Sequence, residues 1–350
     1  MGVTLAGTKL VALAALGALT SDAAIAPAGL TYRVSRPGLS VLTYNVEGLP
    51  WPVRWGRDSK LARIGARLRQ MRAHGDQPHV IVLQEAFTPA AKAIAQTGGY
   101  RYIVDGPDRD LGGAAATTPK DRAFGAAANS LYGETEGKWL DSGLRVGSDY
   151  PIVAVRRMAF PAYACAGFDC LANKGAVAVA IRVPGSAKPV VIVATHLNSH
   201  HSSHASSART LYSYQRQLDA LGAFVRTTIP ADYPLVLAGD LNVGKRLDRR
   251  TYLMRSAATW RPGAQISVAL DSCLADASCD KHNVTDLEFS YRRGRDWQFF
   301  FADRASNFRL KAMVGLFGHD AVGRMLSDHV GYVASYGIGV PTPVARMATR

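Results

Sequence analysis

The sequence is short of three things: long hydrophobic runs, cysteines and acidic residues. Its longest apolar run spans positions 10–19, whereas a helix needs about 20 apolar residues to cross a bilayer. The run is therefore too short to form a membrane-spanning helix. With 27 acidic residues against 41 Lys and Arg, the 350-residue chain carries a net charge of +14. That balance favours anionic partners, such as phosphate esters, nucleic acid or an anionic membrane surface.

The few cysteines fall into two close pairs, Cys165 with Cys170 and Cys273 with Cys279. Four cysteines allow three disulfide pairings, and the short spacings favour pairing each cysteine with its near neighbour. Disulfides are typical of proteins in an oxidising compartment. Neither pair has the CxxC spacing of a zinc finger, so a structural zinc site is the less favoured interpretation.

The first 28 residues have the layout of a secretory signal peptide. Lys9 precedes an apolar stretch, and small residues follow around Ala24 and Ala26, which is the order expected before a cleavage site. We therefore predict a secreted or periplasmic protein; the alternative is a disordered or helical N-terminal extension. No repeat or Pro/Ser-rich linker divides the remaining sequence, which predicts one domain over residues 38–337 and a tail over 338–350.

Short runs rich in Val and Ile alternate with helical patterns along this domain. Apolar residues at spacings of three and four predict amphipathic helices over residues 61–71 and 211–225. Buried strands are predicted over residues 40–46, 79–83, 176–183, 190–195, 235–238 and 330–336. The alternation indicates an α/β protein.

Polar side chains border five of these predicted strands. Taken singly, an Asn or Asp at a strand end is most often a turn or capping residue. Packed strands bring their ends to one edge of a sheet, however, where α/β proteins commonly bind ligands. The residues concerned are Asn45, Glu85, His196, Asp240, Asn242, Asp328 and His329.

These residue types suit the hydrolysis of a phosphate ester. Mg²⁺ prefers oxygen ligands, which Glu85 can supply as a carboxylate and Asn45 as an amide oxygen. A neutral imidazole can take a proton from the attacking water, and a carboxylate on its other nitrogen keeps the right tautomer. His329 is the candidate base.

Three further residues could address the phosphoryl group. Asp240 and Asn242 are two positions apart, so both would point to one face of an extended segment. His196, as a hydrogen-bond donor, could stabilise charge on the phosphoryl oxygens. The set as a whole predicts a metal-assisted hydrolase.

Five ordered motifs carry a family resemblance. The segments TYNVEGLP, LQEAF, THLNS, GDLNVG and SDHVGY resemble the endonuclease/exonuclease/phosphatase superfamily, which includes deoxyribonuclease I and neutral sphingomyelinases. The segment CAGFDCLANKG and the loop LPWPVRW are similar to secreted bacterial sphingomyelinase C. The resemblance implies a four-layer α/β sandwich, in which two mostly antiparallel sheets lie face to face and are flanked by helices.

The resemblance also implies roles for single residues. Glu85 matches the principal metal-binding glutamate, and Asn45 matches the asparagine beside it. His329 matches the general base, and Asp296 matches the aspartate that orients this base. The remaining matches are Asp328, an acidic residue beside the base that is often placed at a metal, and the phosphate-side residues His196, Asp240 and Asn242.

Together these features predict a monomeric, Mg²⁺-dependent phosphodiesterase that splits sphingomyelin or a related phospholipid at a membrane surface. The alternatives are a secreted nuclease with the same core, which would bind nucleic acid, a phosphomonoesterase, and a non-catalytic protein that binds phosphate-rich surfaces. Trp51 and Trp55 are candidate membrane contacts, because aromatic rings favour the lipid interface; otherwise they pack in support of Asn45. Leu316 and Phe317 lie where secreted sphingomyelinases carry a membrane-inserting hairpin, with a buried helix as the alternative.

Overall fold

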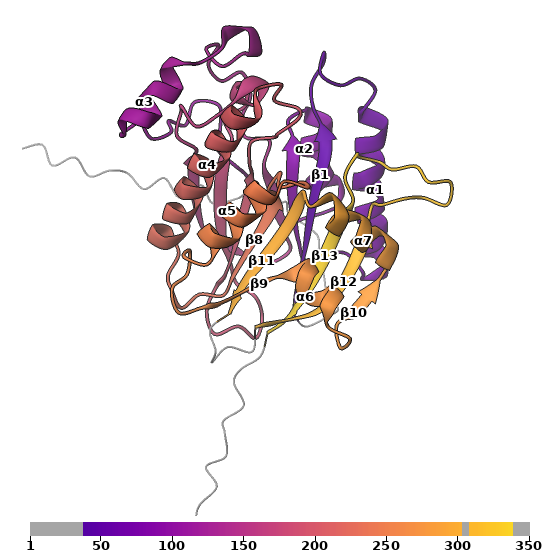
Figure 1. The fold of residues 1–350 in the computed structure, drawn as a ribbon. Helices are drawn as coiled ribbons and strands as arrows, with labels where there is room; N and C mark the ends of the chain where they lie inside the picture. The colour runs from indigo at the N-terminus through magenta and orange to yellow at the C-terminus, as the bar shows by residue number, and fades with distance from the viewer. Residues whose placement is uncertain (1–37, 303–307, 339–350) are drawn as a thin grey trace, which may run out of the picture.

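Two β-sheets packed face to face make up the centre of the computed structural model, which describes residues 38–302 and 308–338 (Figure 1). The first sheet has the strand order β10 (Asp280–His282), β12 (Arg309–Leu316), β13 (Gly331–Gly337), β1 (Leu39–Gly48), β2 (Val80–Ala86), β4 (Arg145–Ser148), β3 (Tyr102–Asp105). The second has the order β5 (Ile152–Ala159), β6 (Gly175–Ile181), β7 (Val190–His196), β8 (Leu235–Asp240), β11 (Asp296–Ala302), β9 (Gln265–Val268). Neighbouring strands are antiparallel except in the parallel pairs β1/β2, β7/β8 and β10/β12.

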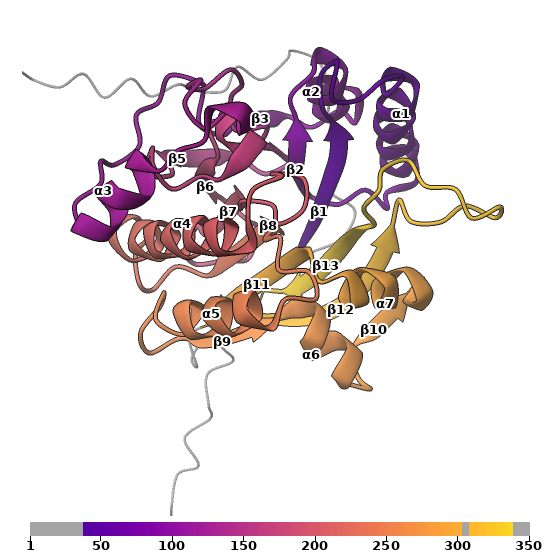
Figure 2. The same cartoon turned by 45° about the horizontal axis from the view of Figure 1, so that its top comes forward.

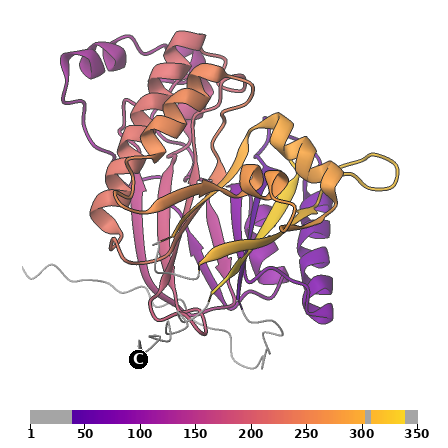
Figure 3. The same ribbon diagram turned by 60° about the horizontal axis from the view of Figure 1, so that its bottom comes forward.

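Helices flank the two sheets and fill one edge between them. They are α1 (Asp58–His74), α2 (Pro89–Thr97), α3 (Pro119–Ala126), α4 (Ser207–Thr228), α5 (Leu247–Ala257), α6 (Ala269–Ala275) and α7 (Val284–Arg293), with 3₁₀ turns η1 (Ser130–Tyr132) and η2 (Gly167–Leu171). Helices α1 and α2 pack on the first sheet, whereas α4 and α5 pack on the second (Figures 2 and 3). Helices α6 and α7 contact β11 and β12, one strand from each sheet, and their Leu270 and Leu287 join the core between the sheets. Helix α3 packs on α4. This arrangement confirms the predicted four-layer α/β sandwich.

Alternation along the strands separates the central layer from the outer layers. In β1, Leu39 and Val41 join the core between the two sheets, whereas Leu42 and Tyr44 pack toward α1 and α2. Successive side chains of a strand point to opposite faces of its sheet, so one strand contributes to both layers. The other strands fill the central layer in the same way, with Val80, Val82, Val177, Val179, Ile192 and Val236.

Helix α1 shows why the predicted helical pattern holds. Its residues Leu61, Ile64 and Leu68 are fully buried, and their spacing places them on one face of a helix. The helix ends at Gly75, whose left-handed φ of 75° lets its N–H donate to the carbonyl of Arg72. A glycine adopts this conformation without steric cost.

Both cysteine pairs form the disulfides that the spacing favoured, between Cys165 and Cys170 and between Cys273 and Cys279. The first bond closes a short loop that contains most of η2, and the second joins α6 to the loop before β10. Each bond therefore fixes local structure at the rim of the sandwich.

The predicted ends of the chain fall outside the described residues. The predicted signal peptide, residues 1–28, lies there, as do residues 339–350 of the predicted tail. Within residues 38–302 and 308–338, no helix combines the length and the apolar character needed to cross a membrane.

Candidate active site

The side chains between the two sheets become polar at one end of the sandwich. In β8, the side chains of Val236 and Ala238 point into the central layer. Asp240, the last residue of the strand, is two positions further on and points the same way. Strand pairing sets His196 of β7 and Asp296 of β11 directly beside Asp240. Paired residues of neighbouring strands share one face of a sheet. The result is a row of three buried polar groups across the end of the second sheet.

The first sheet contributes Asn45 and Glu85 to the same place. In β2, Val80 and Val82 face inward, so a fully extended Glu85 would point outward to the helices. A left-handed φ of 56° at Glu85 turns the carboxylate, whose Oε1 accepts a 2.9 Å hydrogen bond from Asn45 Nδ2. Left-handed backbone is uncommon outside glycine and occurs often at functional sites. The strain at Glu85 is thus what aims its carboxylate.

His329 and Asp296 form a hydrogen-bonded pair between the sheets. His329 Nδ1 lies 2.8 Å from Asp296 Oδ2, and both side chains are buried. This bond fixes the orientation of the ring and leaves Nε2 on the other side. Nε2 lies 3.8 Å from Asp240 Oδ2 and 3.4 Å from Nη1 of Arg295. Atoms of ligand type on Asp240, Asp296 and His329 all lie within 4.8 Å of one another.

A cavity of about 220 Å³ opens at this end of the sandwich. Asn45 and Asp296 do not line the cavity but contact residues that do. Asn45 Nδ2 donates to Glu85 and, over 3.2 Å, to Asp240 Oδ2. Asp296 is hydrogen-bonded to His329. All eight polar site residues predicted from the sequence therefore gather around one cavity. Its lining includes six of them: Glu85, His196, Asp240, Asn242, Asp328 and His329.

Two asparagines differ from what the sequence predicted. Asn45 Oδ1 accepts a 3.0 Å hydrogen bond from the N–H of Glu47, so the amide nitrogen, not the oxygen, faces the carboxylates. Asn242 has a left-handed φ of 48°, so the segment from Asp240 is not extended. Its N–H donates to Asp240 Oδ1 over 2.9 Å, and its Nδ2 donates to the carbonyl of Leu197. Asn45 thus holds carboxylates through its amide nitrogen, and Asn242 holds Asp240 through its backbone N–H.

Three cations to which the sequence analysis gave no role line the same cavity, Arg54, Lys174 and Arg295. Arg54 forms an ion pair with Glu47. Lys174 is buried, and its Nζ lies 3.4 Å from His196 Nε2 and 3.1 Å from Asp169 Oδ2. Arg295 places Nη1 3.4 Å from Asp328 Oδ2. Lys174 ends the CAGFDCLANK segment and Arg295 precedes the aspartate of β11, but a lone basic residue beside a motif is usually solvent-exposed. The sequence signal was therefore weak.

The surroundings of His196 determine its charge. Burial, reinforced by positive charge on Lys174 and His329, holds the pKa of His196 well below its usual range. The ring is therefore neutral near pH 7. Its Nε2 lies 3.4 Å from Lys174 Nζ and 3.6 Å from Asp240 Oδ2. Lys174 thus adds a hydrogen-bond donor beside the neutral imidazole, and the donor role of His196 stays a prediction.

The carboxylates of the cavity suit a hard divalent cation. Burial raises the pKa of Glu85 to about 7, a rise that the hydrogen bond from Asn45 opposes. Burial also raises the pKa of Asp240, although His329 opposes that rise. A divalent cation bound between crowded carboxylates stabilises their ionised forms. Glu85, which is half-buried and lines the cavity, could hold such a cation.

The charge of His329 should depend on that cation. Burial alone would lower the pKa of His329, but the carboxylates of Asp296, Asp240 and Asp328 outweigh it and raise the pKa to about 10. Neutralising part of this negative charge lowers the pKa again. In EDTA at pH 7, we expect nitrogen NMR shifts of a charged imidazole for His329, and an apparent pKa lower by about one unit or more in Mg²⁺.

The same titration has a built-in control. His282 lies on β10 with its side chain largely exposed, so Mg²⁺ should leave its nitrogen shifts unchanged. A His329 ring that is neutral at pH 7 in EDTA, or that ignores Mg²⁺, would contradict this electrostatic description.

The four predicted membrane contacts divide into two kinds. Trp51 and Trp55 are exposed, at 68% and 76%, and contact each other edge to face. Leu316 and Phe317 are instead buried, and the Phe317 ring stacks on Tyr44 with 5.1 Å between centroids. Leu316 ends a strand of the first sheet, so both side chains pack in the layer under α1. The predicted contact through Leu316 and Phe317 is therefore wrong, and so is the alternative of a buried helix.

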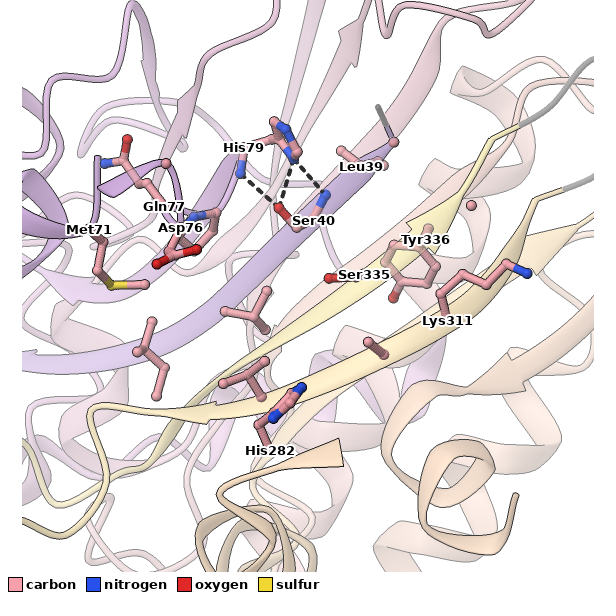
Figure 4. A pocket seen from close by; sticks show the side chains of 18 residues that line it. Leu39, Ser40, Met71, Asp76, Gln77, His79, His282, Lys311, Ser335 and Tyr336 are labelled. Atoms are coloured by element: carbon pink, nitrogen blue, oxygen red, sulfur yellow. Dashed lines mark hydrogen bonds between the residues drawn. The ribbon is translucent and has the colours of Figure 1, made fainter. Parts of the chain in front are cut away.

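A second cavity, of about 600 Å³, lies at the opposite ends of β1 and β2 (Figure 4). Ser40 Oγ lies 2.7 Å from Nδ1 of His79, which resembles an activated serine. The same Nδ1 also accepts the backbone N–H of Ser40, and Ser40 Oγ accepts the backbone N–H of His79. These reciprocal bonds tie two strand starts together. The chemistry suited to a phosphate ester lies at the smaller cavity.

Comparison with solved structures finds proteins of the same fold. Sphingomyelinase C from Streptomyces griseocarneus has a TM-score of 0.57 and 23% identity, over 86% of this chain and 99% of that one. A beta toxin variant from Staphylococcus aureus with bound magnesium ions has a TM-score of 0.58 and 20% identity, over 85% and 99%. TDP2 from D. rerio, complexed with a single strand DNA product, has a TM-score of 0.54 and 13% identity, over 85% and 98%.

At these identities the likeness shows a shared fold. No curated protein is significantly similar to the chain in sequence. Residues 42–330 match the Endonuclease/Exonuclease/phosphatase family, a span that includes every strand end around the cavity. By this match, the chain belongs to the Endonuclease/Exonuclease/phosphatase family.

Proposed function

We propose that the protein is a secreted, Mg²⁺-dependent phosphodiesterase that hydrolyses sphingomyelin or a related phospholipid. One observation carries the proposal: the hydrogen-bonded pair of Asp296 and His329 lies at the cavity that Glu85 also lines. A base fixed by a carboxylate beside a metal-binding carboxylate is the arrangement that water attack on phosphorus requires. Export is supported by the two disulfides and by the predicted signal peptide.

In this proposal His329 acts in its neutral form, which Mg²⁺ at the cavity would favour by lowering the pKa of the ring, and takes the proton from the attacking water at Nε2. Asp296 accepts from Nδ1, which keeps the ring oriented and stabilises the positive charge that it gains. Asp240 and Asp328, whose carboxylate oxygens lie 3.8 Å and 3.9 Å from Nε2, favour the protonated ring after the transfer. Mg²⁺ held by Glu85, with Asp328 at the same cavity, would stabilise charge on the phosphoryl group and on the leaving oxygen.

The cations of the cavity would bind the phosphoryl oxygens. Lys174 and Arg295 carry the ammonium and guanidinium groups closest to His196 and Asp328, and fixed positive charge aimed at a transferring phosphoryl group lowers the barrier. Asn45 and Asn242 hold the carboxylates of Glu85 and Asp240 by hydrogen bonds. They would act as positioning residues.

A nuclease is the second candidate. The net charge of +14 suits a nucleic acid, and TDP2, which is complexed with a single strand DNA product in its crystal structure, shares the fold. Phospholipid is favoured by exposed Trp51 and Trp55 on the segment that also lines the cavity with Leu49, Pro50 and Val53. Sphingomyelinase C, also of this fold, is the more similar in sequence.

One preparation tested on two substrates separates these candidates. We expect the protein to release a phosphorylated head group from sphingomyelin vesicles in Mg²⁺, at a rate at least about 100-fold lower in EDTA. Nicking of plasmid DNA should be slow under both conditions. The His329→Ala protein, purified in parallel, controls for contaminating host hydrolases. Rapid Mg²⁺-dependent nicking without lipid hydrolysis would favour the nuclease instead.

A further inference from the structure

We propose that a rigid apolar rim beside the cavity docks the protein on a phospholipid bilayer. The apolar rim consists of Leu131 and Tyr132 of η1, Trp139, and Phe168 of η2. None of these residues was a candidate contact in the sequence. The inference rests on the proposed function, because it names the surface that would bring the cavity to a lipid substrate.

The four side chains of the apolar rim are large and exposed. Their exposed fractions are 84% for Leu131, 38% for Tyr132, 61% for Trp139 and 44% for Phe168. Tyr132 and Phe168 contact each other edge to face with 5.9 Å between centroids. An exposed cluster of large apolar groups costs solubility and is typical of a binding surface.

The backbone under the apolar rim is held firmly. Glu134, whose side chain is buried, forms an ion pair with Arg209 and accepts hydrogen bonds from the N–H groups of Asn129 and Gly167. The bonds to Asn129 and Gly167 tie η1 to η2. The Cys165–Cys170 disulfide closes the loop around η2, so the exposed groups need no ordering when they bind.

Trp139 is attached to the same platform. The backbone N–H of Trp139 donates to the carbonyl of Leu171 over 2.8 Å. The side chain of Leu171 also packs against Gly133, the residue that follows η1: a Cβ added at Gly133 would lie 3.0 Å from it. Leu171 and Phe168 line the cavity. The apolar rim is therefore continuous with the cavity wall.

A second segment that lines the cavity is apolar as well. Pro50 and Val53 line it, and Val53 is exposed between Trp51 and Trp55. Figure 1 places α3 and the end of β1, which lead into these two segments, at the same end of the sandwich. Apolar residues from two separate segments thus line the cavity, and we expect both segments to face a lipid surface that delivers a head group.

The charges of the apolar rim favour lipid over nucleic acid. Between residues 129 and 139 the only cation is Lys138, and its Nζ donates to the carbonyl of Cys170 over 2.8 Å. Binding to a nucleic acid depends mainly on Lys and Arg contacts with phosphates, which this segment lacks. Aromatic and aliphatic side chains on a rigid turn are instead suited to the interfacial region of a bilayer.

Vesicle binding by an inactive protein tests the inference. In a His329→Ala background in EDTA, we expect the double change Leu131→Ser and Trp139→Ser to weaken sedimentation with phosphatidylcholine vesicles by about tenfold or more. The matched control changes Val284→Ser and Tyr291→Ser, which are exposed on α7, and should alter binding less than about twofold. Trp139→Phe should retain most binding, because it keeps an aromatic ring.

The variants should fold, because Leu131 and Trp139 are exposed, and equal thermal unfolding midpoints check this. Unchanged vesicle binding in the double variant would overturn the inference, as would binding to single-stranded DNA that falls in parallel. Failure of the proposed function looks different: vesicle binding would still depend on Leu131 and Trp139, but the parent protein would release no head group.

Activity on two substrates gives an independent measurement. Leu131 and Trp139 lie outside the cavity lining. When the double change Leu131→Ser and Trp139→Ser is made in the active protein, which retains His329, the rate on a water-soluble aryl phosphodiester should stay the same. The rate on sphingomyelin vesicles should fall about tenfold. Equal losses on both substrates would contradict a docking role, because they would indicate damage to the cavity itself.

Discussion

Replacing His329 with alanine should lower turnover of a phosphodiester by about 10²- to 10⁴-fold, the range that general base catalysis contributes. The imidazole is the group whose Nε2 remains available in the cavity once Asp296 holds Nδ1, and alanine cannot accept a proton. The loss should appear in kcat with little change in KM, because His329 acts on the water and not on ground-state binding. Rates on soluble and vesicle substrates should fall together.

Two companion variants make this result specific. Asp296→Asn should also lower kcat, since an amide can present its N–H to Nδ1 and so favour the wrong tautomer. His282→Ala, an exposed histidine on β10 at the second cavity, should retain full activity. A His329→Ala protein with near-normal kcat would remove this residue from the base role and leave the water without an activating group.

The alternation of strands explains why so much of the site could be predicted from the sequence. His196 and Asp240 end runs of Val, Leu and Ala, and the same two-residue period that buries those runs carries both side chains to one edge. These two positions follow from local pattern, so the sequence alone predicts them. Asp296 begins β11, a strand that was not predicted; only the family resemblance indicated this residue, and strand register aligns it with Asp240.

Residues positioned by long-range contacts could not be found in this way. Lys174 becomes buried beside His196 because β6 and β7 pair antiparallel and the disulfide loop folds over their ends. Glu85 is aimed by a left-handed φ, which no sequence pattern of a glutamate indicates. Leu316 and Phe317 were misplaced because the burial of Phe317 depends on Tyr44, far away in the chain.

Glu85→Gln is expected to lower activity at a fixed Mg²⁺ concentration by about 100-fold or more. An amide keeps the size of the side chain but loses the charge that a hard cation prefers. A titration of activity against Mg²⁺ should show a raised half-saturation point in the variant. Glu288→Gln, on the exposed side of α7, is the matched control and should leave the titration unchanged.

The same substitution should stabilise the metal-free fold above neutral pH. The pKa of Glu85 rises from 4.5 to about 7 on folding because burial penalises its charge. Between these values the unfolded chain releases its proton while the folded protein retains it, so the free energy of unfolding falls as pH increases. Glu85→Gln has no proton to lose, and chemical unfolding in EDTA should show it more stable than the parent at pH 8, on the order of 1 kcal/mol or more, but not at pH 4. Glu85→Gln should thus lower activity but raise stability above neutral pH, whereas a substitution at a residue that only supports the fold would lower both.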